Sequence, residues 1–211
     1  MWRHLLDKFG GRANVYNGIQ RMVGSERVWN GFIHCCQTTI EDWIPSESWL
    51  DLGCGTAEVL DRLPVNIPYI GVDSSPEYIA FAKNKYKERS NTTFVCANWN
   101  DTSWHSLLHS EVIRVVSLLG LLHHLNSDEA QNVLQLSFKV VKHHGTIITL
   151  DGCKEASASK IERFFYWIDR GQFIRNSDEL QRLFPTQPTI SLYNNWLRVP
   201  YCYAVCQVHN S

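Results

Sequence analysis

The chain has 211 residues, 44% of them hydrophobic, with a formal net charge of −1 and a pI of about 6.7. This length favours one well-buried domain over two, and the balanced charge excludes a global electrostatic footprint for nucleic acid. Residues 1–27 carry a local charge of +3, which we interpret as a solvated helical face.

The cysteines number seven, an odd count, and they form neither a CxxC pair nor a set with zinc-ligand spacing. We therefore expect free thiols, no disulfide framework and no metal site, as in a reducing compartment. The N-terminus lacks an apolar signal-like region, and no stretch of about 18 apolar residues occurs. These features predict a cytoplasmic protein.

The pattern of apolar residues predicts two or three helices within residues 3–44 and then a repeating order of strands and helices. Five apolar strand segments, at 48–53, 68–73, 92–97, 112–120 and 145–152, are each followed by a helical segment, at 56–63, 75–89, 103–109, 127–142 and 158–170. Apolar runs of this kind indicate a parallel sheet covered on both faces.

Helix starts are expected at Ser75, which precedes Pro76, and at Ser127, which precedes two acidic residues. After Pro185, the segments "TISLYNNWL" and "VPYCYAVCQV" are separated by Arg198 alone and predict an antiparallel hairpin. The expected fold is an α/β, Rossmann-like, three-layer sandwich with N-terminal helices and this hairpin at the end.

A glycine turn follows the first predicted strand in "SWLDLGCGTAEVLDRLP", and Asp73 ends the second strand 20 residues after Gly53. A carboxylate at that spacing is typical of ribose binding in the crevice beyond parallel strands. No Gly-Lys-Ser/Thr follows the turn, which excludes a P-loop, and Glu58 stands where a dinucleotide site has its third glycine. Carboxylates around the turn suit a cation, so the pattern favours a sulfonium nucleoside over a pyrophosphate.

The motifs "WLDLGCGTAEVLDRLP", "YIGVDSSPEYIAFAKNKY", "FVCANWND", "VVSLLGLLHHL" and "KVVKHHGTIITLDG" together resemble those of class I S-adenosylmethionine-dependent methyltransferases. The resemblance covers roughly residues 45–152 and implies seven strands. The flanks resemble a bacterial subgroup of small-molecule methyltransferases. We accordingly expect one methyltransferase domain over 1–211, with a helical lid region at 1–44, a cofactor-binding core at 45–152, and substrate-side helices and the hairpin at 153–211.

The resemblance also implies which residues bind S-adenosylmethionine. These are Asp51, Gly53, Cys54 and Gly55 for the methionine part, Asp73 and Ser74 for the ribose, Asn98 and Trp99 for the adenine, Leu118 and Leu119 beneath the methionine chain, and Tyr16 on a lid helix. Asn98 stands where the family often has an acidic residue, although an amide can also hydrogen-bond the adenine edge. A core aromatic is the alternative role for Tyr16. Ala57 replaces a glycine that is common in the family.

Two histidines end the fourth predicted strand in the crevice, where His123 or His124 could serve as a general base, because imidazole titrates near neutrality. Backbone hydrogen bonding is the alternative role for this pair. Asp151 could contact the acceptor or cap the following segment. Three arginines, Arg170, Arg175 and Arg198, could hold an anionic acceptor or form structural ion pairs.

These observations predict a methyltransferase that acts by in-line displacement on a small molecule, at oxygen, because the fourth strand ends in "SLLGLLHH" and lacks the Asn-Pro-Pro-Tyr type of motif. The expected partners are the acceptor and the cofactor, with no metal, no membrane and no nucleic acid, in a monomer or homodimer. The alternatives are an RNA methyltransferase and a non-catalytic S-adenosylmethionine-binding module, followed by a nicotinamide dehydrogenase.

Overall fold

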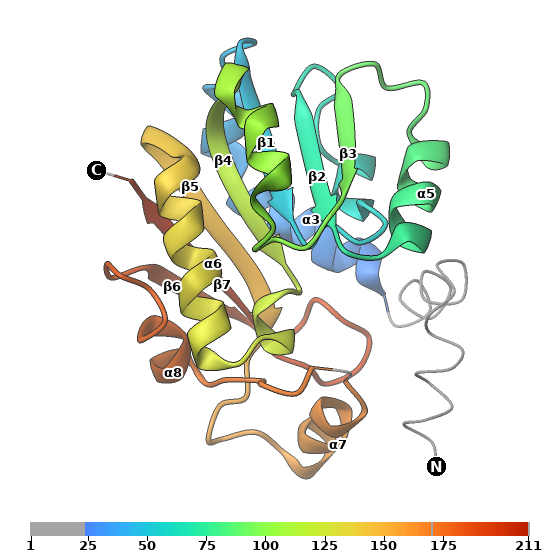
Figure 1. Ribbon diagram of the computed structural model, residues 1–211. Helices are drawn as coiled ribbons and strands as arrows, with labels where there is room; N and C mark the ends of the chain where they lie inside the picture. Colours follow the sequence, from blue (N-terminus) through green and yellow to red (C-terminus); the bar gives the residue numbers. More distant parts are fainter. Residues whose placement is uncertain (1–23, 170, 211) are drawn as a thin grey trace.

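The computed structural model describes residues 24–169 and 171–210, and one seven-stranded sheet runs through them (Figure 1). The strands are β1 Glu47–Leu52, β2 Tyr69–Asp73, β3 Thr92–Cys96, β4 Val112–Leu119, β5 Val141–Gly152, β6 Thr189–Tyr193 and β7 Tyr203–His209. Their order across the sheet is β3-β2-β1-β4-β5-β7-β6. Strands β1 to β5 are parallel, and β7 is antiparallel to both neighbours. The predicted Rossmann-like fold with a terminal hairpin is confirmed.

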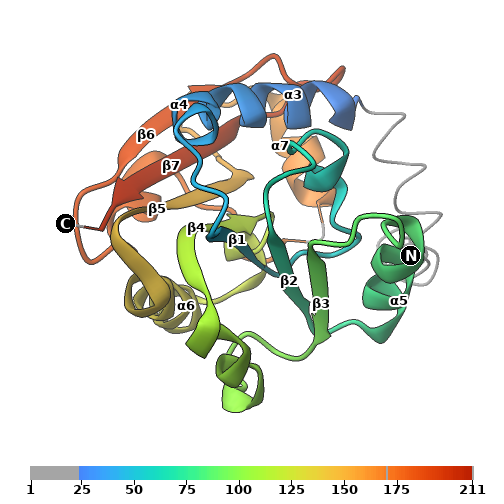
Figure 2. The same ribbon diagram turned by 90° about the horizontal axis from the view of Figure 1, so that it is seen from above.

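Helices cover both faces of this sheet, as the view from above shows (Figure 2). The α-helices are α3 Ser25–Cys35, α4 Gln37–Glu41, α5 Pro76–Lys85, α6 Ser127–Val140, α7 Lys160–Ile168 and α8 Ser177–Gln181, and the 3-10 segments are η1 Glu58–Asp61, η2 Thr102–Ser110 and η3 Leu122–His124. No helix within the described ranges is long and apolar enough to cross a membrane.

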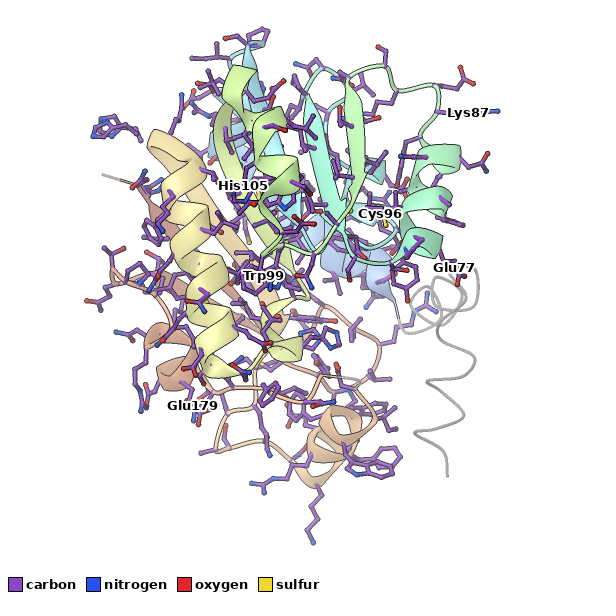
Figure 3. The ribbon with its side chains drawn as sticks, viewed as in Figure 1. Glu77, Lys87, Cys96, Trp99, His105 and Glu179 are labelled. Atoms are coloured by element: carbon purple, nitrogen blue, oxygen red, sulfur yellow. The ribbon has the colours of Figure 1, made fainter. Side chains whose placement is uncertain are left out.

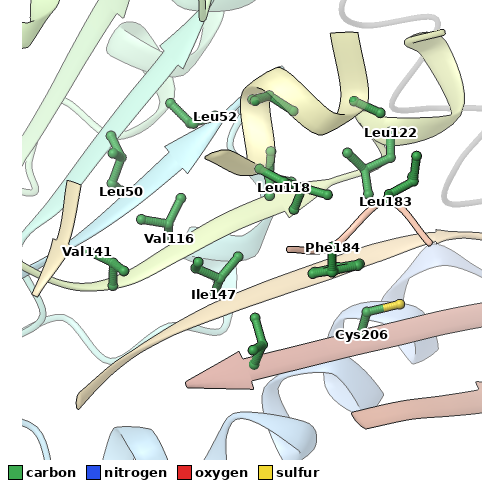
Figure 4. Close-up of a cluster of buried hydrophobic side chains, with 14 of the residues drawn as sticks. Leu50, Leu52, Val116, Leu118, Leu122, Val141, Ile147, Leu183, Phe184 and Cys206 are labelled. Atoms are coloured by element: carbon green, nitrogen blue, oxygen red, sulfur yellow. The ribbon is translucent and has the colours of Figure 1, made fainter. Parts of the chain in front are cut away.

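Two hydrophobic clusters form the core, one on each side of the sheet. Side chains of β1 alternate between them: Leu50 and Leu52 belong to the cluster beneath α6, and Trp49 belongs to the cluster beneath α3 and α5. Figure 4 shows the first of these clusters, in which Val116 and Ile147 meet between the strands. The apolar strand runs in the sequence are therefore explained by burial on both faces.

The segment after β1 is shorter than expected, because only the 3-10 turn η1 forms where an α-helix was predicted at 56–63. Ala57 takes a left-handed conformation with φ 56° and delays the helical start to Glu58. Pro64 then limits the other end, since the residue before a proline disfavours helical geometry. One turn is all that fits between these two constraints.

The helix starts agree with the sequence at one position and differ by one residue at the other. Ser75 caps α5 by accepting a hydrogen bond from the Tyr78 amide, with Pro76 at the first helical position, as predicted. The cap of α6 is Asn126 and not Ser127, because the Asn126 side chain forms a reciprocal capping box with Glu129.

The terminal hairpin has shorter strands and a longer connection than the sequence indicates, because residues 194–202 lie between β6 and β7. Trp196 leaves the strand path to stack on Tyr193, with ring centroids 4.0 Å apart. Its indole lies against Gly31 of α3, where a Cβ atom would come within 2.3 Å of the ring. This packing of the connection against α3 prevents β6 from extending to Leu197.

The amino end of β1 carries a buried ion-pair cluster. Glu47 is 3% exposed, and its carboxylate contacts the guanidinium of Arg114 at 3.2 Å and the ammonium of Lys142. Arg114 comes from β4, which pairs with β1, and Lys142 comes from β5, the next strand in the sheet. The charge of Glu47 is thus balanced within the sheet.

Candidate active site

The turn after β1 brings the backbone to the carboxyl edge of the sheet. Gly53 and Gly55 both have left-handed backbones, with φ of 72° and 54°. The Gly53 and Cys54 amides donate hydrogen bonds to the carbonyl of Val72 in β2. A Cβ atom at Gly53 would lie 2.9 Å from a methyl carbon of Leu121, so this position needs glycine for conformation and for space.

Asp73 lies at the carboxyl end of β2, directly beside this turn. One carboxylate oxygen accepts a hydrogen bond from the Gly55 amide and the other accepts one from the Ser75 amide, each at 2.8 Å. These two bonds fix the carboxylate next to the glycine turn. That position is the one a ribose-binding carboxylate occupies in an open parallel sheet.

Asp51 is the penultimate residue of β1 and is buried, with 1% of its surface exposed. Its two oxygens accept hydrogen bonds from the hydroxyls of Tyr69 and Ser117, each at 2.7 Å. Burial raises the pKa of Asp51 to about 7, although these two hydrogen bonds oppose the shift. Among the salt bridges found in the described part of the chain, none involves Asp51.

A cavity of about 390 Å³ opens over the glycine turn and extends toward η3, α7 and β7. Its wall includes four carboxylate residues, Asp51, Glu58, Asp73 and Asp169. Within residues 24–169 and 171–210, no lysine or arginine contributes to this wall. The cavity therefore presents a negative potential, which suits a cationic or uncharged ligand.

His123 lies in the cavity wall and is held by a buried carboxylate. Its Nδ1 is 2.8 Å from Asp151 Oδ1, and its backbone amide donates to the same oxygen at 3.1 Å. The pairing of Leu119 with Leu150 in β4 and β5 brings the ends of these two strands together. The imidazole is thus oriented by Asp151, whose side chain is 2% exposed.

Asp169 approaches the other nitrogen of the same imidazole, with its Oδ1 3.7 Å from His123 Nε2. The Tyr201 hydroxyl donates to Asp169 Oδ2 at 2.6 Å, and the Gly171 amide donates to Oδ1 at 2.7 Å. Burial would raise the pKa of Asp169, but these hydrogen bonds, together with the positive charge of His123 when it is protonated, outweigh burial and lower the pKa. Two carboxylates therefore flank His123.

The structure brings eight of the residues named from the sequence into the cavity wall. They are Asp51, Gly53, Cys54, Gly55, Asp73, Leu119, His123 and His124. The prediction that Leu118 lies beneath the methionine chain is wrong. Leu118 is fully buried in the core under α6, because side chains alternate along β4 and, of this pair, Leu119 faces the cavity.

Other predicted residues lie outside the cavity wall. Ser74 and Asn98 follow β2 and β3, and Trp99, labelled in Figure 3, packs against the core cluster. Asp151 contacts His123 and is not in the wall itself. Tyr16 and Arg170 lie outside the residues that the structure describes.

The predicted anion-binding role of Arg175 is wrong, since its guanidinium is turned into the protein. Arg175 is 7% exposed and donates hydrogen bonds to the carbonyls of Leu122 and Leu125, at 2.7 and 2.8 Å. These hydrogen bonds hold the η3 segment that carries His123. Arg198 is exposed, outside the cavity wall, and its aliphatic part lies against Gly24.

Sequence reasoning placed Glu58 beside the glycine turn, but it missed Trp29, Asp169 and Tyr201 as parts of one cavity wall. The indole of Trp29 donates a hydrogen bond to Glu58, which ties α3 to η1 beside the glycine turn. A signal for Asp169 existed, because it is a carboxylate directly after an amphipathic helix. Tyr201 had no such signal, since it lies in the connection between β6 and β7, whose position relative to the sheet cannot be read from the sequence.

The fold, the glycine turn and the carboxylate at the end of β2 resemble those of class I methyltransferases. Residues 50–145 match the family model described as a methyltransferase domain. The predicted enzyme class, a methyltransferase that uses S-adenosylmethionine, is thereby confirmed. Among curated proteins, none matches the sequence significantly.

Solved structures of low sequence identity share the fold. Magnesium protoporphyrin IX methyltransferase from Synechocystis PCC 6803, crystallised with S-adenosylhomocysteine, is similar over 100% of both chains, with a TM-score of 0.69 and 12% identity. Geranyl diphosphate C-methyltransferase from Streptomyces coelicolor A3(2) is similar over 88% of this chain and 80% of its own, with a TM-score of 0.67 and 12% identity. A protein of echinomycin biosynthesis is similar over 77% and 74%, with a TM-score of 0.57 and 22% identity.

Proposed function

We propose that this enzyme methylates a hydroxyl oxygen of an uncharged small molecule by in-line displacement, with His123 as the general base. The observation that carries the proposal is the 2.8 Å contact between His123 Nδ1 and Asp151 Oδ1, in the cavity that also contains the glycine turn. A base oriented by a buried carboxylate is needed only when the acceptor must lose a proton.

The residues around the glycine turn fit the cofactor. The backbone of Gly53 and Gly55 can approach it closely, Asp73 is placed for the ribose hydroxyls, and Asp51 offers a buried carboxylate to a positive group. When bound, S-adenosylmethionine supplies a methyl group activated by a sulfonium. The acidic cavity wall is suited to that charge, and two similar structures were solved with S-adenosylhomocysteine.

His123 can accept the proton at one defined atom. With Nδ1 donating to Asp151, the neutral imidazole has its lone pair at Nε2. The acceptor hydroxyl would give its proton to Nε2 as its oxygen takes the methyl group and the carbon–sulfur bond breaks, which leaves S-adenosylhomocysteine. The resulting imidazolium would be stabilised by Asp151 and by Asp169, which lies 3.7 Å from Nε2.

The charge of the cavity favours an uncharged acceptor over an anionic one. Four carboxylates line the wall, and Arg175 is committed to backbone carbonyls. An anion would face these carboxylates without a described cation in the wall to balance it. The proteins with similar folds include enzymes whose names specify small molecules, geranyl diphosphate and magnesium protoporphyrin IX, which supports a small acceptor here.

Calorimetry followed by a transfer assay tests the proposal. The protein should bind S-adenosylmethionine and S-adenosylhomocysteine but not NAD, and it should transfer labelled methyl groups to a member of a panel of uncharged hydroxyl compounds. His123→Gln should lower turnover by roughly 100-fold or more with little change in S-adenosylhomocysteine affinity. The matched control is His143→Gln, an exposed histidine in β5 at the opposite edge of the sheet, which should leave turnover unchanged. Full activity of His123→Gln would refute the role of this base.

A further inference from the structure

Asp169 and His123 present two proton-accepting atoms side by side in the cavity wall. Asp169 Oδ1 and His123 Nε2 are 3.7 Å apart, and both residues line the cavity. Neighbouring hydroxyl groups on one molecule have a spacing that suits such a pair, since each could donate to one of the two atoms. The pair is therefore arranged for recognition as well as for proton removal.

The position of Asp169 is built by contacts from two other segments. Tyr201 comes from the connection before β7 and donates to one oxygen at 2.6 Å, and the Gly171 amide donates to the other. A Cβ atom at Gly171 would fall 2.1 Å from the imidazole Cδ2 of His123, so glycine lets this loop close against the histidine. Such pre-orientation is expected of a binding residue.

Stability of α7 does not explain Asp169. It directly follows α7 at the helix C-terminus, where the helix dipole disfavours a negative charge. The pKa of Asp169 is nevertheless lowered, mainly because His123, Tyr201 and Gly171 together outweigh the effect of burial. The protein thus keeps a carboxylate charged in the cavity wall at a place where helix stability argues against it.

We propose that Asp169, oriented by Tyr201, is an acceptor-binding residue that selects molecules with two adjacent hydroxyl groups. One hydroxyl donates to His123 Nε2 and is methylated, and its neighbour donates to Asp169. This inference rests on the proposed function, because it assigns the acceptor class of the same site. The diol can be aromatic, as in a catechol, or saturated, as in a sugar.

Ligand titration by NMR on the protein saturated with S-adenosylhomocysteine tests the inference. The probes are catechol against phenol, and trans-1,2-cyclohexanediol against cyclohexanol, so that each pair differs by one hydroxyl. In the wild type, at least one diol should bind roughly 10-fold or more tightly than its single-hydroxyl partner, because a hydrogen bond to a charged group is gained. The diol that shows the preference distinguishes an aromatic from a saturated acceptor.

Two variants connect that preference to the named residues. Asp169→Asn should abolish the preference for the diol and leave binding of the single-hydroxyl compound within about 2-fold. Tyr201→Phe, which keeps the ring and removes the orienting hydroxyl, should reduce the preference. Asp178→Asn in the first turn of α8, exposed and outside the cavity, is the matched control and should leave it intact. Thermal unfolding of each variant reports whether it folds.

The outcomes separate this inference from the proposed function. Equal binding of diol and single-hydroxyl compound, no binding of either diol, or an unchanged preference in Asp169→Asn would overturn the diol class while S-adenosylhomocysteine still binds. Failure of the wild type to bind S-adenosylhomocysteine would overturn the proposed function, and the inference with it.

Discussion

Each end of β1 buries a carboxylate, but the groups that surround the two carboxylates differ in charge. At the amino end, Glu47 is 3% exposed and contacts both Arg114 and Lys142. At the carboxyl end, Asp51 is 1% exposed and accepts hydrogen bonds from the hydroxyls of Tyr69 and Ser117, and within the described residues it forms no salt bridge. The charge of Glu47 is balanced by cations of the sheet, whereas Asp51 has hydrogen-bond donors that carry no charge.

This difference separates structure from function within a single strand. A buried carboxylate without a cation is costly, and proteins keep such groups where a ligand uses them. The raised pKa of Asp51 records that cost, and the neighbouring Asp73 and Glu58 add to the negative potential of the cavity. A cationic cofactor would supply at the carboxyl edge the charge that Arg114 and Lys142 supply at the amino edge.

The largest expected effect is the loss of cofactor affinity on removing Asp73. Asp73→Ala deletes the carboxylate that is fixed beside the glycine turn, together with the ribose contacts that we propose for it, and should weaken S-adenosylhomocysteine binding by roughly 100-fold. Calorimetry measures the change. Asp128→Ala, an exposed residue in the first turn of α6, is the control. A loss of less than about 3-fold in Asp73→Ala would show that the carboxyl edge does not bind the cofactor in this way.

At the amino edge, a matched substitution should affect folding and leave binding unchanged. Glu47→Gln removes a charge shared by two cations that are themselves only partly exposed, and should lower the free energy of unfolding by about 2 kcal/mol. Chemical denaturation measures the loss, and calorimetry should give an unchanged affinity for S-adenosylhomocysteine. A changed affinity with unchanged stability would reverse the assignment of the two edges.

The pH dependence of stability should sharpen the contrast at Asp51. Its pKa is about 7 in the folded protein against 3.8 ordinarily, so the folded state binds the proton more tightly. The stabilisation from this group is complete below pH about 4 and is lost as the pH rises through about 7. The Asp51→Asn variant lacks this titrating group. Its free energy of unfolding without ligand, relative to that of the wild type, should therefore rise by about 2 kcal/mol from pH 5 to pH 8. Denaturation curves at both pH values measure this, and a parallel shift of both proteins would contradict the raised pKa.

The smallest effect concerns the strained turn itself. Ala57 has φ 56°, a left-handed conformation that costs an L-residue about 1 kcal/mol, so Ala57→Gly should stabilise the protein by about 0.5 kcal/mol after the entropy of glycine is counted. Ala82→Gly, inside α5, should have the opposite sign. Thermal unfolding compares the two, and a destabilised Ala57→Gly would show that the methyl group matters more than the backbone strain.

The sequence predicted the positions of the glycine turn and of Asp73 well because their signals are local. Gly53, Gly55 and Asp73 are placed by the ends of adjacent parallel strands, which their apolar runs reveal. The sequence could not tell whether Leu118 or Leu119 faces the cavity, since a shift of one residue along a strand exchanges the two faces of the sheet. The sequence also could not predict that η1 is a single turn, because this depends on the left-handed backbone of Ala57.

The acceptor side was predicted only in part, because tertiary contacts create it. Sequence reasoning named His123 and His124 together, and it was the contact with Asp151 that distinguished His123. Arg175 looked like an anion ligand, although its partners are the carbonyls of a distant segment. Asp169 meets Tyr201 through the packing of α7 against the hairpin connection, which no local pattern encodes.

The two halves of the cavity differ in how they are distributed along the chain. The carboxylates beside the glycine turn lie within residues 51–73, whereas the groups around the imidazole are drawn from residues 123–201. Substitutions in the later segments can reshape the space around His123 while the turn after β1 stays intact. Evolution could thus exchange one methyl acceptor for another by altering α7 and the hairpin connection, with the cofactor half inherited unchanged.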